Sequence, residues 1–74
     1  MNKREFLNNL EQVLEVPEGS LKGDESLDGW EKWDSMALIS FMAMADAKLG
    51  IEITPTMLGK CRTVAELAEL AGIR

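Results

Sequence analysis

One serine, Ser35, stands out among the residues of this chain that could take part in covalent chemistry. The chain has no histidine and a single cysteine, Cys61, so it lacks the commonest general base and the usual partner of a catalytic thiol. A lone cysteine cannot form an internal disulfide, and without histidine it is a poor basis for a zinc site. We therefore expect no catalytic residue, no metal-binding residue and no independent enzymatic activity.

The setting of Ser35 has an ordinary explanation and a chemical one. It follows Asp34 and opens a strongly apolar segment, where a serine hydroxyl can cap the first turn of a helix, an interaction worth about 1 kcal/mol. Asp34 would add a favourable negative charge near the positive end of the helix dipole. Because no other residue of the chain is well suited to covalent chemistry, the same setting also fits a site of covalent modification.

The negative charge of the chain lies immediately before Ser35. The formal net charge is −5, and residues 15–34 contain seven acidic residues against two lysines, which equals the whole excess. Binding of nucleic acid needs clustered lysine and arginine, so no nucleic-acid partner is expected. No apolar run approaches the roughly 20 residues that cross a bilayer, and no signal peptide is recognisable. These patterns predict a cytoplasmic protein without a membrane partner.

The elements around this serine are predicted to be helices. Apolar residues at helical spacing predict a first helix over residues 3–15, with Asn2 as its N-cap. Pro17 and Gly19 end that pattern and begin a polar loop that reaches residue 33. Connections of this length are uncommon unless they are functional or held in place. We expect four large apolar side chains to hold the loop: Leu21, Leu27, Trp30 and Trp33.

A second helix is predicted from Ser35 to Leu49, ended by Gly50. Successive residues of a helix lie about 100° apart, which divides its side chains into two sets. The first set has the bulk to face the core: Leu38, Phe41, Met42, Ala45 and Leu49. The second set either packs under the loop or stays available to a partner: Met36, Ile39, Ser40, Ala43 and Ala47.

Two shorter elements complete the predicted fold. Residues 51–53 alternate like a strand but have no second strand to pair with, so we expect an extended connector. Thr54 and Pro55 predict the start of a short helix, and Thr63 with Glu66 forms a capping-box pattern before the last helix. The fold class expected is all-α, a four-helix bundle with three longer helices and one short helix, in a single domain over residues 1–74.

In its motifs the sequence resembles the acyl carrier protein family, whose members have Asp-Ser-Leu at the start of a central helix. Here the tripeptide reads Asp34-Ser35-Met36. The similarity continues through Leu49-Gly50-Ile51-Glu52-Ile53 and into Thr63-Val64-Ala65-Glu66-Leu67, so it spans nearly the whole chain. The chain length, the order of the helices and the net acidity also agree with the family.

The resemblance implies a function for Ser35. A phosphopantetheinyl transferase would move a 4'-phosphopantetheine arm from coenzyme A onto this residue, and acyl-loading and acyl-processing enzymes would use its thiol. The carrier itself would catalyse nothing, and we expect it to act as a monomer. Together with the apolar second set of the central helix, the resemblance predicts partner-docking residues: Asp34, Met36, Ile39, Ser40 and Ala43.

Departures from the family pattern bear on the cargo. Carriers of fatty acid synthesis usually have several acids along the central helix, whereas this one has only Asp46. The sequence Trp33-Asp34-Ser35 is more similar to stand-alone carriers of dedicated pathways, which predicts an acyl carrier of that kind. Met36 is the residue found in D-alanyl carriers, so an aminoacyl carrier of the D-alanyl or peptidyl type is an alternative. A second alternative is a non-covalent helical interaction module in which Ser35 only caps the helix.

Overall fold

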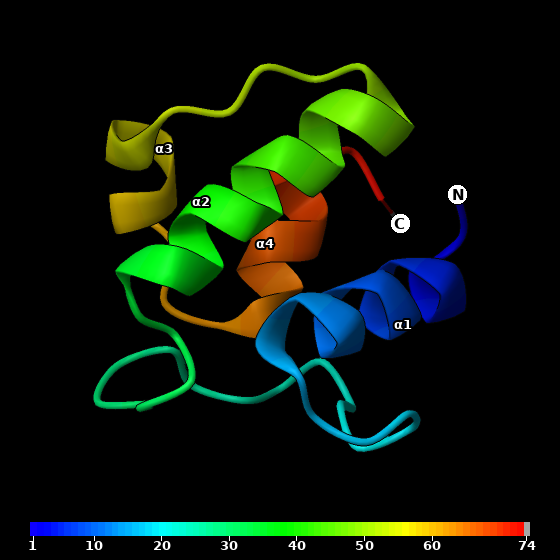
Figure 1. The fold of residues 1–74 in the computed structure, drawn as a ribbon, viewed down its shortest axis with the longest axis vertical. Coiled ribbons are helices and arrows are strands. Elements are labelled where there is room, and N and C mark those ends of the chain that lie inside the picture. The colour runs from blue at the N-terminus through cyan, green and yellow to red at the C-terminus, as the bar shows by residue number, and fades with distance from the viewer. Residues whose placement is uncertain (74) are drawn as a thin grey trace.

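The computed structural model describes residues 1–73, and they form helices in the predicted order (Figure 1). The helices are α1 (Lys3–Leu14), α2 (Ser35–Met44), α3 (Pro55–Gly59) and α4 (Val64–Leu70), and α2 continues into the π-helical turn η1 (Ala45–Leu49). Among these residues the β pairing is limited to an isolated antiparallel bridge between Ser26 and Thr63. The predicted all-α fold, with a long loop between the first two helices, is therefore confirmed.

The first helix begins and ends close to the predicted residues. The Asn2 side chain accepts a hydrogen bond from the Glu5 amide at 2.8 Å, and the Glu5 carboxylate accepts one from the Asn2 amide at 3.1 Å. These two reciprocal bonds satisfy amides that the helix leaves free. The helix ends at Leu14, one residue before the predicted end, and Glu15 caps it in the left-handed conformation, with φ of 58°.

The buried face of α2 differs in part from the predicted one. Phe41 and Ala45 are fully buried as predicted, and Ala37 and Met44 are buried in addition. The other three members of the predicted set are only partly buried: Leu38, Met42 and Leu49. The segment is apolar on nearly every side, so its pattern defines no clear stripe, and contact with the neighbouring elements decides which side faces inward.

The end of the second helix confirms one prediction and adds a feature that no pattern indicated. Gly50 ends the helix in the left-handed region, with φ of 65°, and its amide donates to the Asp46 carbonyl at 3.1 Å. The last turn before it is π-helical, with wider hydrogen-bonded rings than an α-helix. Ile51 then continues as the predicted extended connector, in which Ile53 is buried.

The last two helices begin at the predicted caps. Thr54 accepts a hydrogen bond from the Met57 amide, and Pro55 occupies the first position of α3. Thr63 accepts from the Glu66 amide at 3.2 Å at the start of α4. The predicted capping box is incomplete, because the Glu66 carboxylate accepts from the Arg62 amide at 3.0 Å and from the Thr63 hydroxyl at 3.4 Å, but not from the Thr63 amide. No helix of residues 1–73 is both long and apolar enough to cross a membrane.

The loop between α1 and α2 is held by the four predicted side chains. Leu21 and Leu27 are buried, and Trp30 and Trp33 are partly buried against the core. Midway along, backbone hydrogen bonds join the loop to the segment before α4: the Leu27 amide donates to the Arg62 carbonyl at 2.8 Å, and the Val64 amide donates to the Glu25 carbonyl at 3.1 Å. The loop follows the ends of the helices along one side of the molecule (Figure 1).

A buried glutamate in α1, which no sequence pattern indicated, holds the beginning of this loop. Glu11 is 1% exposed, and its Oε2 atom accepts hydrogen bonds from the Leu21 amide at 2.9 Å and from Arg4 at 3.3 Å. Oε1 has no hydrogen-bond partner of good geometry among the described residues. Burial acts to raise the pKa of Glu11, but the Gly19 and Leu21 amides and the charge of Arg4 outweigh it and lower the pKa below 4.5.

We predict that Glu11→Gln lowers the free energy of unfolding near pH 7 by about 1–3 kcal/mol, because a charge-assisted buried acceptor is lost. A lowered native pKa means that the carboxylate stabilises the fold above the unfolded-state pKa, near 4.5, and that this stability is lost as the pH falls through the native pKa. The difference between the two proteins should therefore shrink in acid.

Urea unfolding near pH 7 and near pH 3 measures both effects. Glu52→Gln, which changes an exposed carboxylate on the connector, is the control and should leave stability nearly unchanged. A Glu11→Gln variant as stable as the unaltered protein near neutral pH would contradict the role assigned to this carboxylate.

Candidate functional site

Ser35 is the first residue of α2, and its side chain is exposed. The N-cap of the helix is Asp34, whose Oδ1 atom accepts a hydrogen bond from the Ala37 amide at 2.9 Å. The interpretation of Ser35 as the capping residue is therefore wrong by one position. Among residues 1–73 the Ser35 hydroxyl makes no hydrogen bond, so it is free for a reaction at the surface.

The environment of Ser35 suits a phosphodiester. The first amides of a helix have no partner within the helix, and the helix dipole places partial positive charge at this end. Asp34 satisfies the Ala37 amide and offsets part of this positive potential, so the amides of the first turn that Asp34 does not use are the ones left for an anionic group on Ser35. The residues present thus fit a phosphate ester on the Ser35 oxygen.

We predict that two neighbouring substitutions differ in their effect on the free energy of unfolding. Asp34→Ala should lower the free energy of unfolding by about 1 kcal/mol, because the Ala37 amide loses its cap. Ser35→Ala should change it by only a few tenths of a kcal/mol, because the Ser35 hydroxyl has no partner to lose. Urea unfolding of the two variants measures both effects, with Asp34→Asn as a control that retains a capping oxygen. A larger loss of stability for Ser35→Ala than for Asp34→Ala would mean that Ser35, and not Asp34, caps the helix.

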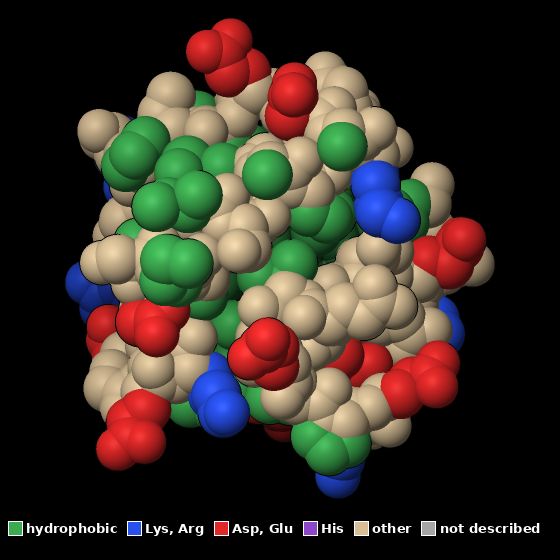
Figure 2. Space-filling model, in the orientation of Figure 1, with side chains coloured by type: hydrophobic (Ala, Val, Ile, Leu, Met, Phe, Trp, Pro, Cys, Tyr) green, Lys and Arg blue, Asp and Glu red, His purple; other side chains and the backbone are tan. Residues whose placement is uncertain are grey.

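The residues predicted for docking follow Ser35 on the outer side of α2. Met36 is 70% exposed and Ile39 is 59% exposed, while Ala43 is exposed and Ser40 is partly buried. Figure 2 shows hydrophobic side chains gathered over α2 and α3, with acidic side chains over the loop below them. Large apolar side chains that remain this exposed are typical of a surface that meets a partner.

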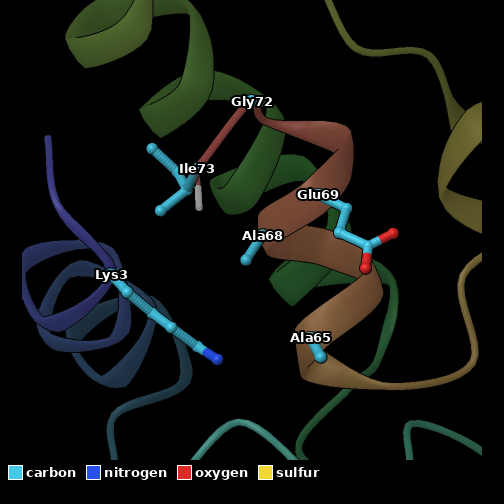
Figure 3. A pocket seen from close by; sticks show the side chains of 6 residues that line it. All are labelled: Lys3, Ala65, Ala68, Glu69, Gly72 and Ile73. Atoms are coloured by element: carbon cyan, nitrogen blue, oxygen red, sulfur yellow. The ribbon is translucent and has the colours of Figure 1, made fainter.

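Two concave regions lie at different ends of the fold. A groove of about 510 Å³ between the end of α1 and the start of α2 includes Asp34 and Met36, the two neighbours of Ser35. A cavity of about 570 Å³ lies between α1 and α4 (Figure 3) and is lined by Lys3, Ala65, Ala68, Glu69, Gly72 and Ile73. The second cavity has no residue of α2 in its lining, so it is separate from the serine.

The remaining reactive side chain is unsuited to nucleophilic chemistry. Cys61 is partly buried, and burial, together with the charges of Glu66 and Glu69, raises the pKa of its thiol. A reactive cysteine needs the opposite shift. Within residues 1–73, no three histidine, cysteine, aspartate or glutamate side chains are grouped so that they could hold a metal ion.

The sequence matches the family model described as "Phosphopantetheine attachment site" over residues 4–71. The match spans the long loop and every helix, and of the helical residues it leaves out only the first residue of α1, Lys3. The chain therefore belongs to this family of carriers: it carries covalently attached 4'-phosphopantetheine, interacts with a phosphopantetheinyl transferase and with partner enzymes, and is not itself a catalyst. No curated protein and no solved structure matches the chain.

Membership of this family decides between a carrier with a covalent arm and a non-covalent interaction module. A non-covalent interaction module is set aside, because family members hold a prosthetic group. The cap on which that alternative depended is Asp34 rather than Ser35. The family match leaves the choice between acyl, aminoacyl and peptidyl cargo open.

Proposed function

We propose that Ser35 carries the arm and that the chain is a single-domain acyl carrier serving a dedicated biosynthetic pathway of lipid or polyketide type. The observation that supports the site most strongly is the state of the hydroxyl, which is exposed at the first position of α2 and relieved of capping by Asp34. When bound, the arm supplies a thiol on which an acyl group is held as a thioester. A monomeric state and a cytoplasmic location stay predictions.

The other serines have less suitable surroundings. The Ser20 hydroxyl donates to the Pro17 carbonyl at 2.6 Å, so it is already engaged. Ser26 lies in the bridge to Thr63 and does not begin a helix. Ser40 lies inside α2 and is partly buried. Ser35 alone among these four combines exposure with a position at a helix start, which supports its assignment.

The proposed modification forms one bond and breaks one. The Ser35 Oγ atom attacks the phosphorus of coenzyme A that bears the pantetheine group, and a new P–O bond forms. The bond from that phosphorus to the rest of the pyrophosphate breaks, and adenosine 3',5'-bisphosphate leaves. The serine proton passes to a base of the transferase, because this chain has no histidine and Asp34 is occupied as the helix cap.

We propose that partner enzymes dock on Asp34 and on the outer side of α2. The docking residues are those predicted from the sequence: Asp34, Met36, Ile39, Ser40 and Ala43. The exposure of Met36 and Ile39 supports an apolar contact, as does the single acid, Asp46, of the segment from Ser35 to Leu49. Burial of two such side chains is a substantial part of a small transient interface.

Incubation with coenzyme A and a broad-specificity phosphopantetheinyl transferase should add one phosphopantetheine group to the protein. Intact-mass spectrometry checks this, and fragmentation should place the group on Ser35. Ser35→Ala should gain no mass, whereas Ser26→Ala, a matched loss of an exposed serine hydroxyl away from α2, should still be modified. Full modification of Ser35→Ala would remove Ser35 from its proposed role.

The same assay tests the docking face. Ile39→Ser should raise the KM for the carrier severalfold, because an exposed apolar contact is removed, and should leave the fold intact because Ile39 is largely outside the core. Glu52→Gln, an exposed change on the connector, should leave the KM unchanged. Equal KM values for all three proteins would argue against docking through Ile39.

The cargo can be read from protein purified from its own cells. Hydroxylamine cleaves thioesters, and we predict that it releases an acyl hydroxamate of fatty or polyketide type, identifiable by mass spectrometry. Release of an amino acid hydroxamate would instead support the aminoacyl alternative, which rests on Met36 in the Asp34-Ser35-Met36 tripeptide. Ser35→Ala protein treated in the same way is the control and should release neither.

A further inference from the structure

The groove beside Ser35 combines an apolar floor with an acidic rim. Its floor is formed by Val13 and Leu14 from the end of α1 and by Ala37 from the first turn of α2. Figure 2 shows hydrophobic side chains at the bottom of a hollow between α1 and α2, with acidic side chains at its lower end. Because Asp34 and Met36 belong to its wall, a protein that reaches Ser35 meets the groove as well.

The rim has an excess of negative charge, because three acidic residues line the groove and Lys32 offsets only part of their charge. Glu15 and Glu31 are exposed rim residues, and neither carboxylate has an ion-pair partner among residues 1–73. Asp34 adds a third acid, and Lys32 is the basic residue of the lining. A ligand with a positive charge and an aliphatic stem is complementary to this combination.

The placement of charge differs from that of an acidic central helix. The segment from Ser35 to Leu49 has one acid, Asp46, which does not line the groove. The acids nearest to Ser35 come instead from the end of α1 and from the long loop. The acidic surface near Ser35 is therefore the groove at the base of α2 and not the outer side of that helix.

We propose that the transferase that modifies Ser35 seats an arginine or lysine side chain in this groove, with its stem on Val13 and Leu14 and its cationic group against Glu15 and Glu31. The inference rests on the proposed role of Ser35 and adds a docking site that the apolar face of α2 does not include. Lys32 repels the incoming cation and weakens its binding, whereas Glu15 and Glu31 attract the cation and strengthen its binding.

The backbone at Glu15 offers a test that separates docking from stability. Glu15 is the non-glycine residue with positive φ among the described residues, at the position after a helix where glycine is preferred. Glu15→Gly relieves the steric cost of a side chain in the left-handed region and removes the carboxylate from the groove. This variant should be at least as stable as the unaltered protein and yet bind the transferase less well.

The experiment measures the KM for the carrier with coenzyme A and a broad-specificity transferase at about 0.15 M salt, where charges more than about 8 Å apart are largely screened. Glu15→Gly and Glu31→Gln should each raise the KM roughly threefold, and the double variant about tenfold, with kcat unchanged. Lys32→Gln should lower the KM roughly twofold. Glu18→Gln removes an exposed acid of the same loop outside the groove and should leave the KM unchanged.

The possible results lead to different conclusions. If the unaltered protein is not modified at Ser35, the proposed function fails before the groove is tested. If it is modified and the groove variants keep its KM, the groove inference is overturned while the attachment site stands. An equal rise in KM for Glu18→Gln would also overturn it, because diffuse acidity would then suffice. Urea unfolding of Glu15→Gly, and of Glu15→Gln if the glycine variant is less stable, shows whether loss of fold contributes.

Discussion

The ring of Phe41 holds α2 against both α1 and the long loop. It is fully buried and meets Phe6 of α1 and Trp33 of the loop edge to face, with ring centroids 6.0 Å and 5.9 Å apart. Edge-to-face pairs contribute about 0.5–1.5 kcal/mol each beyond their buried area. Because Phe41 points inward, α2 can turn only one side to the core, and Met36 and Ile39 are left outside.

The long acidic loop depends on a second constraint, the buried carboxylate of Glu11. A charged group inside a small core is costly unless it is paired and hydrogen-bonded, and here one oxygen accepts from both Arg4 and the Leu21 amide. The loop gains a fixed beginning, and its end is fixed where Trp33 packs and Asp34 caps α2. The acids between these points are thus carried on a backbone whose two ends are fixed.

The function of such a carrier lies in presentation more than in chemistry. The thiol belongs to the prosthetic group, and in the proposed reaction the base that accepts the serine proton belongs to the transferase. What this chain provides is an exposed hydroxyl that has no hydrogen-bond partner within residues 1–73, an apolar helix face and an acidic groove beside it. Because Asp34 is the cap, the proposed modification of Ser35 would remove no hydrogen bond on which α2 depends. The helix cap and the proposed attachment site are thus neighbouring residues.

The sequence by itself determined the features that depend on a few neighbouring residues. Caps at Asn2, Thr54 and Thr63 were predicted correctly, as were the left-handed Gly50 and the four apolar side chains of the loop. Such signals are local, since a cap or a turn involves residues within one turn of each other. The family resemblance, carried by the Asp34-Ser35-Met36 motif and its surroundings, was also recognisable at this level, and residues 4–71 match the family model.

Tertiary structure alone decided the rest. Both Asp34 and Ser35 can cap a helix, and the choice between them depends on which residue adopts extended backbone angles at the end of the loop. The buried side of α2 could not be derived because the helix is apolar nearly all round, so that Ala37 and Met44 were missed. From the sequence, Glu11 would be expected at the surface. In the structure the loop folds back and brings the Leu21 amide, ten residues later in the chain, to the Glu11 carboxylate. The groove exists only because α1, the loop and α2 meet, and no spacing in the sequence encodes a meeting of three separate segments.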